Sequence, residues 1–248
     1  MRKRLRKILL AFLIIFAVLC AGFLIYASDY YHASDTALQY LAKSGEGVTV
    51  TCKNHQMVFT PDHVSSGMIF YPGGKVAYEA YAPLLYRCAQ KGILCIMPEM
   101  PLNLAIFGIN RADGLKKAYP EITDWYLAGH SLGGSMAAVY LKNHAADYKG
   151  LILLASYSTE DLRDTGLSVL SVYGSEDHVL NLVSYAKARK NLPAALTEKV
   201  IPGGCHSYFG MYGIQSGDGI PSISNNDQLD TAAQLISSWT TDLHRQTD

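Results

Sequence analysis

The stretch Trp125–Gly134, WYLAGHSLGG, decides how the rest of this sequence is interpreted. It holds Ser131 in the pattern Gly-x-Ser-x-Gly, after residues that can end a strand and before residues that can begin a helix. Glycine on both sides permits a strained backbone at the serine, and small residues let the following helix lie close to a sheet. This pattern is typical of a nucleophilic serine on a sharp strand-to-helix turn. The alternative is an ordinary glycine-rich turn in which Ser131 only caps the helix, and the pentapeptide alone does not decide between the two.

Outward from this turn, segments with strand character alternate with segments of helical apolar spacing. We expect strands at 67–74, 93–100, 125–131, 150–156, 167–175 and 196–204, and helices at 76–92, 102–122, 132–144, 180–190 and 228–243. Before them, residues 28–47 predict a short helix and residues 48–61 a pair of antiparallel strands. The alternation predicts an α/β fold with a mostly parallel sheet that is covered by helices on both faces.

The length and charge of the chain limit the possible functions. The chain has 248 residues, of which 49% are hydrophobic, so it can bury the core of one good-sized domain. The formal net charge is zero, but five of the 21 basic residues lie among the first seven positions. The remaining 16 basic residues stand against 21 acidic ones, which leaves the rest of the chain mildly acidic. Such a surface disfavours binding to nucleic acid.

The N-terminus carries a membrane signal. Residues 1–7, MRKRLRK, form a basic segment that we expect to be cytoplasmic, and residues 8–27 follow without a single charge. Twenty apolar residues are long enough to span the hydrocarbon core, so 8–27 is expected to be a transmembrane anchor that leaves 28–248 as an extracytoplasmic domain. A signal peptide that is cleaved near Ala27 is the alternative, although its apolar region is usually shorter. A lipoprotein signal at Cys20 is disfavoured because Leu19 precedes it.

Polar residues at the carboxyl ends of the expected strands are the candidates for chemistry, because ligands bind there in such sheets. Asp177, in YGSEDHVLN, follows one buried strand and is the candidate acid, which would orient a histidine and stabilise its charged form. Glu176 is one residue away and faces differently, and Asp161 follows the preceding strand as a weaker contender. The alternative is that Asp177 only caps the next helix.

His206, in IPGGCHSYFG, is the candidate base, because it lies on a glycine-rich loop after the last expected strand. It would take a proton from Ser131 and return it to a leaving group. His130 lies inside the turn and His178 lies beside the acid, so both are expected to be structural or to line a substrate site. The remaining histidines fit the base worse: His32, His55, His63, His144 and His244.

Two backbone amides are candidates for binding a developing oxyanion. The amide of Leu132 directly follows the candidate nucleophile, and the glycine-rich turn in FYPGGKV would supply the second amide from Gly74 or Lys75. Glycine lets the backbone approach a substrate closely. The alternative is an ordinary strand-to-helix turn.

The order of these motifs resembles the α/β-hydrolase superfamily from about Gly67 to the C-terminal helix. The stretches FYPGGKV, MPLNLAIF, AGHSLGG and HSYFGMYGIQSGDG more closely resemble a compact bacterial family related to dienelactone hydrolases, often with one N-terminal membrane span. The resemblance implies a Ser-His-Asp hydrolase that uses Ser131, His206 and Asp177. Dienelactone hydrolases themselves use a cysteine nucleophile where this chain has Ser131, so their substrate does not carry over. A second departure is Cys205, which stands before the histidine where a small polar residue would be expected.

The expected activity is hydrolysis of carboxylic esters or thioesters by a membrane-anchored, extracytoplasmic enzyme. Only residues 157–166 separate two expected strands where lid domains are commonly inserted, so we expect an open site with minimal or no lid. The segments MPLNLAIF and SYFGMYGIQSGDG are expected to form its apolar rim, which would suit a small-molecule or lipid-like ester. A peptidase or amidase with the same triad and a non-catalytic binding module are the alternatives.

No metal or organic cofactor is expected. The five cysteines have no C-x-x-C spacing or paired histidines, which disfavours a structural zinc site. The apolar neighbours of Cys95 favour buried free thiols, although an exported domain could form disulfides.

Overall fold

The computed structural model describes residues 2–43 and 45–245, without the side chains of residues 2 and 3. Residues 1, 44 and 246–248, which belong to the expected segments 1–7 and 28–248, lie outside the described residues. The chain divides into two compact units, Met1–Tyr30 and Tyr31–Asp248.

The first unit contains one helix, α1 (Arg2–Ser28), which includes the expected apolar segment. Its stretch Arg4–Ser28 is long and apolar enough to cross a membrane, with a mean hydropathy of 3.2. An N-terminal signal sequence can satisfy the same criteria of length and hydropathy.

The second unit is built on an eight-stranded sheet with the order β1-β2-β4-β3-β5-β6-β7-β8. The strands are β1 (Val48–Lys53), β2 (Gln56–Pro61), β3 (Ser66–Tyr71), β4 (Ile93–Pro98), β5 (Trp125–His130), β6 (Gly150–Leu154), β7 (Ser168–Gly174) and β8 (Leu196–Ile201). Strands β1 and β2 form an antiparallel hairpin, and β2 also pairs antiparallel with β4. All further pairs are parallel, so the predicted mostly parallel sheet is confirmed.

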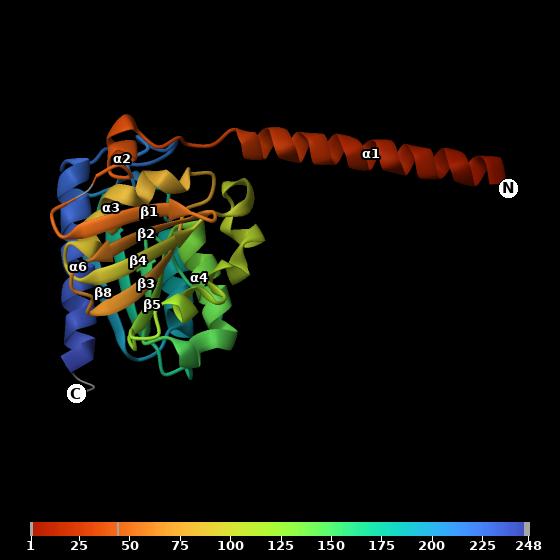
Figure 1. Ribbon diagram of the computed structural model, residues 1–248. Helices are drawn as coiled ribbons and strands as arrows, with labels where there is room; N and C mark the ends of the chain where they lie inside the picture. The colour runs from red at the N-terminus through yellow and green to blue at the C-terminus, as the bar shows by residue number, and fades with distance from the viewer. Residues whose placement is uncertain (1, 44, 246–248) are drawn as a thin grey trace. The chain divides into compact units, whose positions relative to one another are not determined.

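Helices cover both faces of this sheet, as predicted (Figure 1). Helices α3 (Ala82–Ala89) and α6 (Asn225–Arg245) lie on one face and α4 (Leu132–His144) on the other. Successive side chains of β3 alternate between two cores: Met68 and Phe70 pack on the α3 and α6 side, and Ile69 and Tyr71 on the α4 side. Because both faces of the sheet are buried, both sets of alternate side chains are apolar, and the buried strands appear in the sequence as continuous apolar runs. The two short helices are α2 (Asp35–Gln39) and α5 (Leu182–Ala188).

The helix expected at 102–122 is wrong. The chain there forms four short 3-10 turns: η2 (Pro101–Asn103), η3 (Ala105–Phe107), η4 (Ile109–Ala112) and η5 (Leu115–Ala118). Leu102 and Asn103 have φ values of 56° and 54°, which a continuous α-helix does not allow. The Tyr71 hydroxyl also donates to the Ile109 carbonyl and accepts from the Ala112 amide, so a side chain replaces helical hydrogen bonds.

Three other expected helices differ at their ends, and the one expected at 180–190 forms α5 (Leu182–Ala188) and a 3-10 turn, η7 (Arg189–Asn191). The segment 76–92 forms a 3-10 turn, η1 (Tyr78–Tyr81), before α3, and α6 extends beyond the expected 228–243 at both ends. Between β6 and β7, residues 155–167 contain no helix, in agreement with the predicted absence of an inserted lid.

Candidate active site

Ser131 occupies the sharp turn between β5 and α4. Its backbone has φ 52° and ψ −123°, a region that non-glycine residues rarely adopt. The Ser131 amide donates to the Leu154 carbonyl at 2.9 Å, and the Ser156 hydroxyl donates to the Ser131 carbonyl at 2.6 Å. Ser131 makes no side-chain capping hydrogen bond to α4, so its hydroxyl does not cap the helix. The end of β6 and the segment after it therefore hold a strained serine whose hydroxyl does not cap the helix.

The three glycines around Ser131 are required by close contacts with backbone and side-chain atoms. A Cβ atom on Gly133 would lie 2.2 Å from the Tyr71 carbonyl oxygen, and one on Gly129 would lie 2.5 Å from the Gly133 carbonyl carbon. A Cβ on Gly134 would lie 2.6 Å from the Ser156 hydroxyl oxygen. No real Cβ atom approaches so closely, so the sequence pattern reflects the tight packing of α4 on the sheet.

The structure pairs Asp177 with His206. Nδ1 of His206 lies 3.0 Å from Oδ2 and 3.1 Å from Oδ1 of Asp177, and both residues are buried. Oδ1 of Asp177 also accepts the amides of Val179 and Leu180, at 3.0 and 2.8 Å, which fix the carboxylate. Asp177 does not cap α5, because Asn181 does so through the Ser184 amide.

The other sequence candidates lie elsewhere. Asp161 is exposed and forms an ion pair with Arg163, which lowers the pKa of Asp161 to about 2, so it is not the partner of His206. Glu176 accepts the hydroxyl of the adjacent Ser175, and His178 is exposed.

His206 and Ser131 line the same cleft. Its volume is about 270 Å³, and its wall consists of Ser131, Leu132, Ser135, Ala155, Ser156, Tyr157, Val179, Leu180, Asn181 and His206. Because the Asp177 carboxylate can only accept, Nδ1 of His206 carries the proton and Nε2 is left as an acceptor. Nε2 is buried and has no hydrogen-bond partner among the described residues. No hydrogen bond joins it to Ser131 in the structure described, and such bonds commonly tighten only when substrate is bound.

The loop that carries His206 is held by two residues that the sequence did not single out. The Asp218 carboxylate accepts the amides of His206 and Ser207 at 3.1 and 2.8 Å, and it also accepts the Ser207 hydroxyl. These hydrogen bonds lower the pKa of Asp218 although burial opposes them. The buried side chain of Gln228 bonds both the amide and the carbonyl of Cys205. Asp218 lies within the quoted stretch HSYFGMYGIQSGDG, but that stretch does not assign it a role, and Gln228 lies outside every quoted stretch.

The structure distinguishes between the candidate oxyanion donors after β3. The Lys75 amide donates to the Asn103 carbonyl at 2.8 Å, so it is occupied. The Gly74 amide donates no hydrogen bond among those described, and a Cβ on Gly74 would lie 2.8 Å from the Leu132 side chain. Leu132 begins α4, where helical amides lack intrahelical partners. Gly74 therefore lies against the side chain of Leu132, the residue whose amide is the other predicted donor.

The expected apolar rim does not form the wall of the cleft. Neither MPLNLAIF nor the segment after His206 contributes a residue to it, and 155–157 and 179–181 line it instead. Phe209 and Met211 of the second segment are buried in the core. The wall consequently mixes polar and apolar side chains.

The cysteines are free thiols in the structure, and Cys88, Cys95 and Cys205 are buried. Burial, with a smaller contribution from the Asp218 charge, raises the pKa of Cys205 to about 12, so this neighbour of His206 is no nucleophile near neutral pH. The described residues contain no group of three or more His, Cys, Asp or Glu side chains arranged to hold a metal ion.

Comparisons with known proteins agree with this architecture. A family model described as the alpha/beta hydrolase family matches residues 67–230. A dienelactone hydrolase from Anabaena variabilis is similar in structure, with a TM-score of 0.59 and 14% identity over 79% of this chain and 98% of its own. A carboxyl esterase from Tuber melanosporum has a TM-score of 0.61 and 10% identity, over 87% of this chain and 91% of its own. A monoglyceride lipase from Saccharomyces cerevisiae has a TM-score of 0.56 and 11% identity, over 82% and 97%. A search of curated proteins gives no match.

Proposed function

The chain belongs to the alpha/beta hydrolase family, and from this premise we propose that it cleaves carboxylic esters or thioesters with Ser131, His206 and Asp177. The observation that carries the proposal is the buried pair of Asp177 and His206. His206 has an unpartnered Nε2 and lines the same cleft as the strained Ser131.

In the proposed reaction, Nε2 of His206 accepts the Ser131 hydroxyl proton as Oγ attacks the carbonyl carbon of the substrate. Asp177 holds Nδ1–H and stabilises the imidazolium that forms. The imidazolium then protonates the leaving alcohol or thiol, which leaves an acyl group on Ser131. Water attacks this acyl group with His206 again as base, and the acid is released as Ser131 regains its proton.

The amides of Leu132 and Gly74 would bind the oxyanion during both steps. Their support is that each amide lacks an internal acceptor and that Gly74 lies against Leu132. The N-terminus of α4 adds a partial positive charge at the same position. One lost donor in such a site costs about 10²–10³ in rate.

The size of the cleft favours a small acyl group. A volume of about 270 Å³ without a covering lid suits short chains better than long ones. Long-chain lipid esters would leave most of their acyl chain outside the cleft.

We further propose that α1 anchors the enzyme in a membrane, with the hydrolase unit on the extracytoplasmic side. The support is the length and hydropathy of Arg4–Ser28 and the basic residues among positions 2–7. Fractionation of expressing cells with N-terminal sequencing tests this. An intact N-terminus in the membrane fraction is expected, and a soluble chain that begins near Ser28 would favour a cleaved signal peptide.

Initial rates of the full chain in detergent on matched substrates test the activity. We expect the highest kcat/KM on p-nitrophenyl acetate or butyrate, lower values on octanoate and laurate, and much lower values on the p-nitroanilides of the same acids. Equal rates on ester and anilide would favour an amidase. A folded protein that hydrolyses none of these would favour a non-catalytic binding module.

A further inference from the structure

A buried hydrogen-bond chain joins the two loops of the site through the residue before Ser131. The Gly73 amide donates to the Tyr81 hydroxyl at 3.0 Å, and this hydroxyl lies 2.8 Å from Nδ1 of His130. Nε2 of His130 lies 3.1 Å from the backbone carbonyl oxygen of His206. The chain therefore runs from the glycine-rich turn after β3, across the end of β5, to the loop after β8.

The proton positions along this chain follow from the partners. The His206 carbonyl can only accept, so Nε2 of His130 carries a proton and Nδ1 of a neutral ring must accept. The Tyr81 hydroxyl consequently donates to Nδ1 and accepts the Gly73 amide. Every donor in the chain meets one acceptor.

The burial of both side chains keeps this arrangement in place. Tyr81 and His130 are fully buried. Burial, together with the His206 ring 4.6 Å away, holds the pKa of His130 well below its usual value, and burial raises the pKa of Tyr81. Both therefore stay neutral over the working range of a hydrolase, and His130 keeps one donor and one acceptor.

We infer that Tyr81 and His130 are positioning residues for the proposed reaction, which is the function on which this inference rests. Gly73 precedes Gly74, the proposed oxyanion donor, and the carbonyl that His130 holds belongs to the candidate base itself. This chain of hydrogen bonds thus fixes the turn that contains Gly74 and the loop that carries His206 relative to Ser131. Displacements of about 1 Å in such a constellation cost about 10²-fold in rate.

If the Tyr81 hydroxyl only stabilised the fold, its removal would lower Tm without lowering kcat specifically. Tyr71 provides the matched control. Its hydroxyl also makes two hydrogen bonds, here to the Ile109 carbonyl and the Ala112 amide, but these groups belong to the 3-10 segment outside the cleft. Tyr81→Phe and Tyr71→Phe each remove one such hydroxyl, so their losses of thermal stability should be similar.

The experiment measures kcat, KM and Tm of both variants of the full chain in detergent on the best ester of the parent. We expect Tyr81→Phe to lower kcat at least about tenfold with KM changed less than about twofold, because an interaction that matters in the transition state is weakened. Binding of an alkyl boronic acid, which resembles the tetrahedral intermediate, should weaken in parallel. Tyr71→Phe should change neither. Equal kcat in the two variants would overturn the inference.

A second pair covers the case in which Tyr81→Phe does not fold. His130→Gln can keep an N–H toward the His206 carbonyl, whereas His130→Leu cannot. We expect the glutamine variant to retain clearly more kcat than the leucine variant, and equal values at similar Tm would contradict the inference. A parent that hydrolyses no ester would instead show the failure of the proposed function.

Discussion

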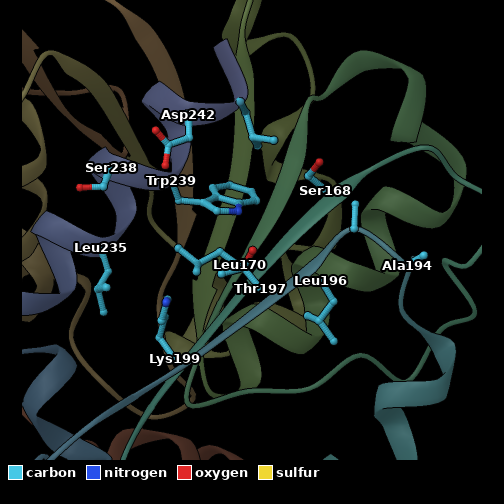
Figure 2. Close-up of a pocket in the computed structure, with 12 residues that line it drawn as sticks. Ser168, Leu170, Ala194, Leu196, Thr197, Lys199, Leu235, Ser238, Trp239 and Asp242 are labelled. Atoms are coloured by element: carbon cyan, nitrogen blue, oxygen red, sulfur yellow. The ribbon is translucent and has the colours of Figure 1, made fainter. Parts of the chain in front are cut away.

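Two hollows at opposite ends of the parallel strands differ in a way that volume does not predict. The larger, of about 510 Å³, lies where β7 and β8 begin and is bounded by the second half of α6. Figure 2 shows Trp239 and Asp242 on the helix, with Ser168, Leu196 and Lys199 on the strands. The smaller, of about 270 Å³, lies at the carboxyl ends and contains Ser131 and His206.

The two hollows differ in backbone strain and in polar groups without a hydrogen-bond partner. The smaller one combines Ser131 at φ 52° and Ala155 at φ 47° with a buried imidazole nitrogen that has no described partner. The larger one has no histidine or cysteine among its lining residues, and the Trp239 indole fits against Gly150, where a Cβ would lie 2.6 Å away. It is a gap in the packing of a helix on a sheet. A strained backbone and a buried polar atom without a hydrogen-bond partner indicate a catalytic site better than the volume of the hollow does.

The largest effect expected from this comparison is on the serines of the two hollows. Ser131→Ala should lower kcat for ester hydrolysis about 10⁴-fold or more, because the nucleophile is lost. Ser168→Ala, in the larger hollow, should leave kcat and KM unchanged. Steady-state kinetics on one ester measures both, and a comparable loss in the two variants would remove the distinction between the hollows.

The next largest difference is expected between Asp177, the partner of His206, and Asp242 of the larger hollow. Asp177→Asn should lower kcat about 10³-fold or more, because the amide no longer holds the Nδ1–H tautomer of His206. Asp242→Asn keeps all contacts of the cleft and should have parental kinetics. A fall of less than about tenfold in Asp177→Asn, with the fold intact by circular dichroism, would argue against the triad.

The glycines test the packing beneath the smaller hollow. Gly133→Ala would place a Cβ 2.2 Å from the Tyr71 carbonyl oxygen, so we expect a loss of about 3 kcal/mol or more in the free energy of unfolding. Gly166→Ala faces open space at φ +73° and should lose only about 1 kcal/mol. Urea unfolding measures both. Equal losses would show that the turn at Ser131 is packed more loosely than its contacts indicate.

The smallest expected effect is on pH dependence. Burial and the His206 ring depress the pKa of His130, so the unfolded chain takes up a proton below about pH 6.5 that the folded protein does not bind. The unfolding free energy should therefore fall on acidification below this pH, by up to about 1.4 kcal/mol per pH unit, with no contribution above it. Urea unfolding at several pH values should show this slope in the parent and lose it in His130→Gln. An identical slope in both would assign the acid sensitivity to other groups.

The local sequence pattern was enough to predict the turn at Ser131 and the parallel sheet. It did not predict the long-range hydrogen bonds that stabilise the surrounding segments. Gly129, Ser131 and Gly133 are adjacent in sequence, so their shared geometry is readable, and alternation of strands with helices predicts the parallel sheet. The helix expected at 102–122 failed because the Tyr71 hydroxyl, distant in sequence, satisfies that backbone instead.

The candidate site follows the same division. Ser131, Asp177 and His206 could be proposed because each follows the carboxyl end of a recognisable strand. Tyr81, Asp218 and Gln228 act through contacts with residues 11 to 49 positions away, which local sequence patterns do not predict. The choice of Gly74 over Lys75 likewise depends on the distant Asn103 carbonyl.

The most direct test of the central claim is covalent labelling of the full chain by a fluorophosphonate probe, with the modified peptide identified by mass spectrometry. An activated serine should take up one probe per chain at Ser131, Ser131→Ala should take up none, and His206→Ala should react much more slowly. A folded parent that does not react, or a label on Ser168 in the larger hollow, would contradict the account.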